Sequence, residues 1–468
     1  MHNKIWLKAL IVISMFAAFM AIYHLLQQKP IYSNTLGKIT LNYERVDTNR
    51  NSIVKEVNVP FAKFTEKNAV HWDTKFYSSI RDSIYASNST SAIYRYAFYP
   101  FFPLVWKASH TNVHGIVFLN YLFFGISLIL LSSIFLNGYK SEMFYFMLAL
   151  VLPSTIVFYL PYTESLFMLT FSIAVVGLFK KKYWLFFIAI ICFSMTRPSA
   201  LILAMAFILI NTLNLFYHKK IKWFLRDCSF TVLPILLGWM AVVYIQYYYS
   251  ASWDTYTIAC SFWLKESSLY RYATDWSIEG FGMTAFAIFA FIIPACIYGV
   301  VWGVSAVLGK EKENRISLFS GDENYIKKFL FNTSVLFIIG FILYNLFTSG
   351  YNLNGIYRYS MATPFFFIIL FQLPEKLKSV PLQYRLSGFV LVFISITLFL
   401  LSTEYAGNLL RFKYLGLYLL LILLFFTAIE SSISNKVKII FFILILIPCL
   451  VWHAYLFNMY LADAWIFT

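Results

Sequence analysis

The chain alternates long apolar runs with short polar connections from one end to the other. After a first run over 5–26, apolar runs recur near 113–136, 143–160, 163–179, 184–195, 198–217, 229–250, 283–308, 329–348, 361–373, 386–402, 415–431 and 437–458. Runs of this kind are typical of helices that cross a bilayer, which needs about 20 apolar residues per crossing. We therefore expect an all-α integral membrane protein, a single polytopic domain over 1–468 with about 11 to 13 transmembrane helices.

Composition and charge agree with this class. Of 468 residues, 60% are hydrophobic and 12% are charged, about half the charged fraction of an ordinary soluble domain. The net charge of +16 does not indicate nucleic acid here, because Lys and Arg gather in the short connections of one side, about 20 against about six on the other. This bias predicts a cytoplasmic N-terminus and a long first extracytoplasmic loop over 27–112 that contains amphipathic interfacial helices.

The long polar interruption at 71–103 reads HWDTKFYSSIRDSIYASNSTSAIYRYAFYPFFP. Trp72, Phe76, Ile80 and Ile84 recur every four residues, which predicts an amphipathic helix in the membrane interface. Asp73 then lies at the boundary between water and lipid, where a carboxylate can accept a proton from a hydroxyl as a general base. Alternatively, Asp73 is only the N-cap of the helix that follows, since Asp is favoured at that position.

Arg197 is expected just below the outer membrane surface. The basic clusters at 180–182 and 218–222 should both be cytoplasmic, yet only about 35 residues separate them, too few for two full crossings. At least one of the two helices should therefore be short. An arginine at that depth faces a protein interior or an anion; otherwise it extends outward to the surface or pairs with Glu164.

Arg358 lies between Tyr357 and Tyr359 in NGIYRYSMATP, at another outer helix boundary. A guanidinium between aromatic rings suits a phosphate, because its donors engage two oxygens at once. The other interpretation is an ordinary anchor at the membrane interface, where tyrosine is enriched.

Motifs for other chemistries are missing from the sequence. The five cysteines lie far apart, with neither zinc spacing nor a disulfide framework. The sequence holds no Walker motif, DxD pair or HExxH helix, which argues against an ATP-driven pump, a metal-dependent nucleotide-sugar enzyme or a zinc protease.

The 71–103 stretch resembles the first luminal loop of the GPI mannosyltransferases of the PIG-V type and their prokaryotic relatives. The residues that carry the resemblance are Trp72, Asp73, Phe76, Ile80, Ala97, Phe98, Tyr99, Pro100 and Pro103. PYTESLF at 161–167 and the Arg-Tyr pattern after 357 resemble later turns of the same family more loosely. Those enzymes have the GT-C fold and take a sugar from a polyprenyl-phosphate carrier.

The resemblance implies a mannosyltransferase that uses a polyprenyl-phosphate sugar donor and a glycan, glycolipid or protein acceptor, with inversion and with neither metal nor cofactor. It makes Asp73 the general base and Arg197 and Arg358 the donor-phosphate ligands. The residues expected to bind substrate are Trp72, Glu164, Tyr357, Tyr359 and Tyr99. The enzyme would lie in the plasma (inner) membrane of a prokaryote or the endoplasmic reticulum of a eukaryote, with its site on the extracytoplasmic or luminal face.

A transporter or flippase of a lipid-linked or amphipathic substrate would have the same hydropathy. Transporters place binding residues near the membrane midplane, often in repeated halves. Here Asp73, Glu164, Arg197 and Arg358 all map to the outer boundary and no internal repeat is visible, which favours chemistry at one face. A polymerase or ligase that moves a whole glycan is disfavoured only by the resemblance.

Overall fold

The computed structural model describes residues 2–28, 42–43, 54–55, 61–86, 90–262, 297, 318–348, 356–402, 415–463 and 466. Within them the chain is helical, apart from the two-residue strands β1 (Asn42–Tyr43) and β2 (Val54–Lys55), which pair antiparallel. The expected helix near 283–308 lies outside the described residues except for one position.

Six helical segments of the described chain are long and apolar enough to cross a membrane. They are Lys4–Leu26 within α1 (His2–Leu26), α6 (Val113–Phe135), Ile221–Ser250 formed by α11 (Ile221–Thr231) and α12 (Leu233–Ser250), Glu323–Asn345 within α17 (Glu323–Thr348), Leu415–Ser432 formed by α21 (Leu415–Ile429) and η8 (Glu430–Ser432), and α22 (Asn435–Leu461). The protein is therefore a multi-pass helical membrane protein, as the sequence predicts.

Shorter helices complete the bundle. They are α8 (Glu164–Phe179), α9 (Tyr183–Ser194), α10 (Ala200–His218), α19 (Pro364–Lys378) and α20 (Leu382–Ser402). With 12 residues, α9 spans only about 18 Å. The expectation that one helix beside Arg197 is short is therefore confirmed.

The run expected as one helix near 143–160 is broken. It forms α7 (Glu142–Val151) and η3 (Pro153–Tyr159), which meet at an angle of 68°. Pro153 has no N–H to continue α7, and it holds Leu152 in an extended conformation. The Leu152 carbonyl oxygen at the break accepts from Thr155 N at 2.9 Å and from Thr155 Oγ1 at 2.7 Å, and His453 Nε2 lies 2.9 Å from it, so partners from η3 and α22 meet at the bend.

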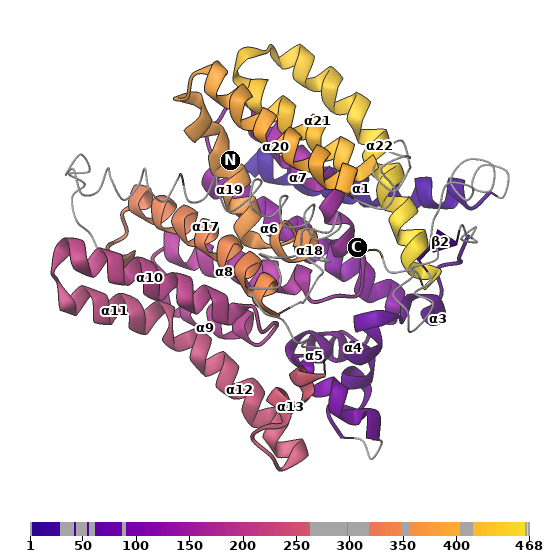
Figure 1. Ribbon diagram of the computed structural model, residues 1–468, viewed down its shortest axis with the longest axis vertical. Coiled ribbons are helices and arrows are strands. Elements are labelled where there is room, and N and C mark those ends of the chain that lie inside the picture. The colour runs from indigo at the N-terminus through magenta and orange to yellow at the C-terminus, as the bar shows by residue number, and fades with distance from the viewer. Residues whose placement is uncertain are drawn as a thin grey trace.

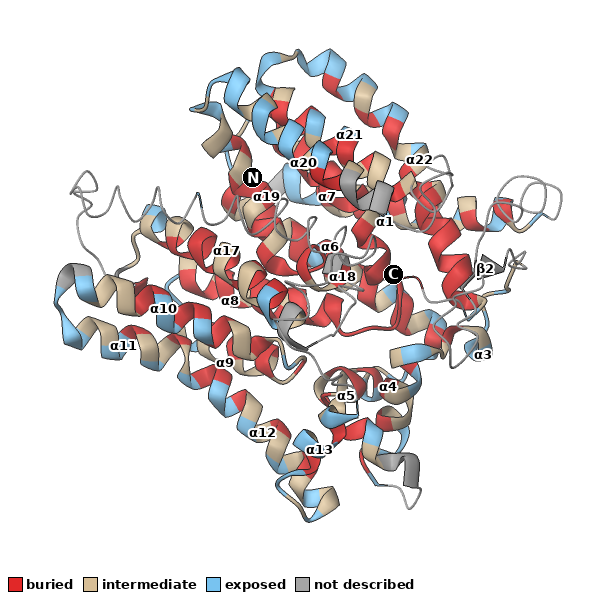
Figure 2. Ribbon diagram, viewed as in Figure 1, coloured by how far each residue is buried: buried red, intermediate tan, exposed pale blue. Residues whose placement is uncertain are grey.

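Buried residues concentrate in α6, α8 and α19 at the centre of the bundle, whereas α10, α11 and α12 show more exposed positions on their outer sides (Figure 2). Beside α9 and α11, α12 begins and runs outward to α13 (Thr255–Ser261), which lies beside η2 (Thr90–Ala97) (Figure 1). Two further short elements of the bundle are α18 (Ile356–Ser360) and η5 (Leu318–Ser320).

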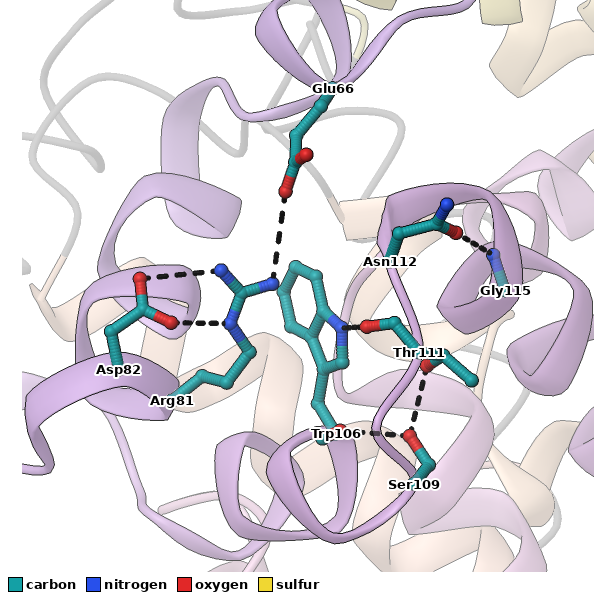
Figure 3. A network of polar contacts seen from close by, with 8 residues as sticks. All are labelled: Glu66, Arg81, Asp82, Trp106, Ser109, Thr111, Asn112 and Gly115. Atoms are coloured by element: carbon teal, nitrogen blue, oxygen red, sulfur yellow. Dashed lines mark hydrogen bonds and ion pairs between the residues drawn. The ribbon is translucent and has the colours of Figure 1, made fainter.

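Four short elements at 66–108, which we call the cap, cover one end of the bundle. They are α3 (Glu66–Ala69), α4 (Trp72–Ser83), η2 and α5 (Phe101–Ala108). An arginine clamp holds three of them: the Arg81 guanidinium lies 4.4 Å from the Trp106 ring, 2.7 Å from Asp82 and 4.0 Å from Glu66 (Figure 3). Trp106 in turn donates from Nε1 to Thr111 O at 3.0 Å, which ties α5 to the start of α6.

The amphipathic helix expected after Asp73 is present as α4, but its buried face differs from the predicted stripe. Thr74, Tyr77 and Ile80 are buried, whereas Trp72 is 40% exposed. A series of every fourth residue advances by about 40° per step around a helix of 3.6 residues per turn, so Trp72 and Ile80 cannot share one narrow face.

Candidate functional site

Four charged side chains from distant parts of the chain meet beside the cap. Arg358 Nη1 lies 2.8 Å from Asp73 Oδ2, and Arg358 Nε donates to Glu164 Oε1 at 2.5 Å. Arg197 Nη1 lies 2.6 Å from the same Glu164 oxygen. We call Asp73, Glu164, Arg197 and Arg358 the charge cluster. All four were predicted as site residues from the sequence, and the fold brings them together.

The helices explain why these residues meet. Asp73 lies in the first turn of α4 and Glu164 is the first residue of α8. Arg197 lies three residues before the start of α10, and Arg358 lies on α18 just before α19. The N-terminal ends of α4 and α8 therefore point their positive dipole ends toward the cluster, which favours carboxylates and phosphates there.

Accessibility differs sharply within the charge cluster. The side chains of Glu164 and Arg358 are 0% and 2% exposed, whereas Arg197 is 12% and Asp73 is 23% exposed. A ligand that enters from solvent thus meets Asp73 first and Arg197 next. Glu164 lies behind them and binds both guanidinium groups.

Charge in the cluster is balanced, with two carboxylates and two guanidinium groups. Burial by itself would lower the pKa of Arg358, but Glu164, Tyr359 and Asp73 together raise it well above its usual range. Arg358 therefore stays positively charged at every physiological pH. A buried arginine with two carboxylate partners is a fixed cation available to an anionic ligand that replaces one of them.

Aromatic rings line both arginines. The Arg358 Cζ lies 4.3 Å from the Tyr162 ring centroid and 5.2 Å from that of Tyr359, which also lies 5.4 Å from the Arg197 Cζ. The Tyr359 ring thus lies against both arginines, and its predicted role in binding substrate stays a prediction. Burial raises the pKa of Tyr162 and Tyr77, so both phenols stay neutral next to the carboxylates.

Sequence reasoning missed Tyr162, although it lies two residues before Glu164. It also missed the polar residues that hold the turn at 160–163. Asn120 Nδ2 donates to Leu160 O at 2.6 Å and to Tyr162 O at 3.0 Å. The only sequence signal is an amide inside an apolar run, which periodicity alone does not assign.

A second tie joins this turn to the start of α4. Thr74 Oγ1 lies 2.7 Å from Tyr460 Oη, which donates to Ala69 O at 2.8 Å. Thr74 also approaches Pro161 O at 3.4 Å. Because Thr74 follows Asp73 and Pro161 precedes Tyr162, these contacts help to set the separation of Asp73 and Glu164.

The two alternatives kept for Asp73 and Arg197 come out differently. His71, not Asp73, occupies the N-cap position of α4, and Asp73 binds Arg358 instead, so the capping interpretation is wrong. Arg197 does pair with Glu164, as its alternative stated. Trp72, next to Asp73, has φ 49°, a left-handed conformation that is costly for a bulky residue.

Tyr99, predicted to bind substrate, lies apart from the charge cluster. The Tyr99 ring lies 5.8 Å from the Tyr256 ring of α13, and among the described residues it makes no contact with the four charged side chains. The side chain of Tyr357 lies outside the described part of the structure. Over the described ranges, no group of three or more His, Cys, Asp or Glu side chains could hold a metal ion.

The chain matches no family model, no curated protein and no solved structure. The likeness of 71–103 to the first luminal loop of PIG-V-type mannosyltransferases therefore stays a prediction from the residues. The chemistry of the charge cluster has to be argued from its own geometry.

Proposed function

We propose that the protein is an integral-membrane glycosyltransferase of the GT-C type. It would move a sugar, mannose by the sequence resemblance, from a polyprenyl phosphate to a hydroxyl of a glycan, glycolipid or protein acceptor at the extracytoplasmic or luminal face. The observation that carries the proposal is a partly exposed carboxylate, Asp73, in direct contact with a buried arginine at one end of an apolar bundle.

In this reaction Asp73 accepts the proton of the acceptor hydroxyl. The freed oxygen attacks the anomeric carbon, a new glycosidic bond forms, and the bond between that carbon and the phosphate oxygen breaks. The bonding electrons leave with the phosphate, and attack from the opposite face inverts the anomeric configuration. The general base contributes by removing the proton as the bond forms.

Arg358 and Arg197 stabilise the departing lipid phosphate. A guanidinium offers paired N–H donors that match two phosphate oxygens, and charge stabilisation counts most where charge develops. Without ligand, Arg358 is paired with Asp73 at 2.8 Å. A donor phosphate that takes the place of Asp73 on Arg358 would release the carboxylate to act as a base, while Glu164 keeps both arginines in position.

The location of the charge cluster favours this proposal over a transporter. It lies where α4 and α8 begin and just before α10 and α19, rather than at the middle of these helices. A substrate pathway would place its charged residues along the bundle interior near the midplane.

The decisive pair of variants is Asp73→Asn and Asp82→Asn, assayed with whichever polyprenyl-phosphate sugar the wild-type protein uses. Asp73→Asn removes the proton acceptor but keeps the shape, so transfer should fall by about 100-fold or more. Asp82 is 61% exposed and paired with Arg81, so its replacement should leave transfer near wild type. Full activity of Asp73→Asn, or loss only in Asp82→Asn, would exclude Asp73 as the base.

A further inference from the structure

Arg95 on η2 is buried without a countercharge. The residue is only 6% exposed, and its Nη1 donates to the hydroxyls of Ser79 at 2.9 Å and Ser83 at 3.1 Å, both on α4. Its Nη2 is buried and has no hydrogen-bond partner. No Asp or Glu of the described chain forms an ion pair with it.

Arg81 shows what a fully satisfied arginine of the same cap looks like. Its guanidinium pairs with Asp82 and Glu66 and stacks on Trp106 (Figure 3). The Arg81 side chain is 18% exposed and has two carboxylate partners, whereas Arg95 is more deeply buried and its partners are two neutral hydroxyls. The fold supplies an anion to one arginine of the cap and not to the other.

The buried guanidinium of Arg95 needs an anionic partner that accepts hydrogen bonds, and this need defines the kind of ligand that can bind there. A buried guanidinium destabilises a protein unless an anion and hydrogen-bond acceptors compensate it. The C-terminal end of α4, close to Ser83, offers a partial negative charge, but Nη2 makes no hydrogen bond to it. Ser83, whose hydroxyl accepts from Arg95 Nη1, is exposed, so this polar group lies close to the surface of the cap.

We propose that Arg95, Ser79 and Ser83 form a second anion-binding site, which takes a phosphate or carboxylate group. Ser79 and Ser83 follow Asp73 on α4 by six and ten residues, about 9 and 15 Å along the helix axis. The identity of the anion rests on the proposed function: if the protein is a glycosyltransferase, the anion is an acidic group of the acceptor whose hydroxyl reaches Asp73. A lipid headgroup of the same chemistry is the other source.

The test measures thermal unfolding of the purified protein in detergent, with inorganic phosphate against chloride at equal ionic strength. Phosphate should raise the Tm of the wild type, and Arg95→Gln should remove about half or more of that rise, the remainder coming from Arg197 and Arg358. Ser79→Asp places a carboxylate beside Arg95, so it should raise the Tm without phosphate and reduce the phosphate effect equally. Arg81→Gln is the matched control, which should lower the Tm but keep the full phosphate-dependent rise.

A second arm compares nanodiscs of zwitterionic lipid with nanodiscs that also hold an anionic phospholipid. Stabilisation that depends on Arg95 only in the anionic nanodiscs assigns the site to a lipid headgroup, and stabilisation by inorganic phosphate assigns it to a soluble or acceptor-borne anion. An equal Tm response of wild type and Arg95→Gln in both arms would overturn the site. No transfer is measured, so a failed glycosyltransferase assay leaves this result standing.

Discussion

Arg358 makes contacts that depend on the shape of its guanidinium group. Two of its nitrogens bind two different carboxylates, Asp73 and Glu164, while the plane lies near the Tyr162 and Tyr359 rings. A lysine ammonium keeps the charge but has neither the fork nor the flat face. The side chain is therefore suited to hold one carboxylate while it exchanges the other for a phosphate.

Arg358→Lys should lose most transfer activity and weaken donor binding by about tenfold or more, since one bidentate contact is worth roughly 1.5–3 kcal/mol. Transfer rate and donor affinity should be measured together. Arg385→Lys is the control, because Arg385 lies far from the charge cluster. Arg385 donates to Ala428 O and Ser431 Oγ close to the start of α22, whereas the cap lies beside Tyr460 at the other end of that helix. If Arg358→Lys keeps wild-type rate and affinity, Arg358 does not bind the donor phosphate.

Glu164, Arg197 and Arg358 could be predicted because each interrupts apolar sequence at a helix boundary, and Asp73 because it opens an amphipathic helix in the polar stretch 71–103. Tyr162 could not, since tyrosine is common throughout this chain and only the fold places one over Arg358. Tyr99 was assigned by motif likeness, and in the structure it packs against α13. A charged residue in apolar sequence can thus be recognised as a site candidate from the sequence, whereas the contacts of an aromatic ring depend on tertiary packing and cannot.

The turn at 160–163 is the element on which the site geometry depends most. It carries Tyr162 and leads into Glu164, and the fully buried Asn120 amide binds carbonyl oxygens on both sides of Pro161. Without these bonds each carbonyl loses one hydrogen bond, worth roughly 0.5–1.5 kcal/mol, while Leu160 O still accepts from Tyr162 N at 2.8 Å. We therefore assign Asn120 a positioning role.

Asn120→Ala should lower the transfer rate constant by about tenfold, with a smaller change in donor affinity, because the turn shifts while Arg197 and Arg358 remain. Asn211→Ala is the matched control: Asn211 is also buried and donates to Thr231 Oγ1 at 3.3 Å, on the contact of α10 with α11. Both variants should lower the Tm, but only Asn120→Ala should slow transfer. An equal loss of rate in the two, or none in either, would reduce Asn120 to a packing residue.

Helix existence was predictable and helix continuity was not. Apolar length located α6, α8, α9, α21 and α22 closely, because a bilayer imposes long apolar runs. The break between α7 and η3 follows from Pro153, yet an apolar run that contains proline can also continue through it. His453 of α22 contacts Leu152 O at the break, and Asn120 of α6 binds the turn that follows η3; both residues are distant in sequence from the break.

Within the described residues, buried charges lie at both ends of the bundle. Buried Lys8 binds Glu142 at 2.7 Å, the exposed Lys4 binds the same carboxylate at 2.9 Å, and Lys438 pairs with Glu430. These pairs join α1 to α7 and η8 to α22, at the end of α22 away from the cap. They tie helices together, whereas the charge cluster beside the cap presents a partly open carboxylate, which is the asymmetry expected of an enzyme that works at one face.

Transfer of a sugar from a polyprenyl phosphate can be measured by incubating the purified protein in liposomes with a panel of such donors and a mixture of glycan and glycolipid acceptors. We expect one donor, with mannose first among the candidates, to be consumed and free polyprenyl phosphate to appear in equal amount. The new glycosidic bond should have the inverted anomeric configuration. Movement of intact donor between leaflets with no polyprenyl phosphate released would exclude the glycosyltransferase and identify a flippase.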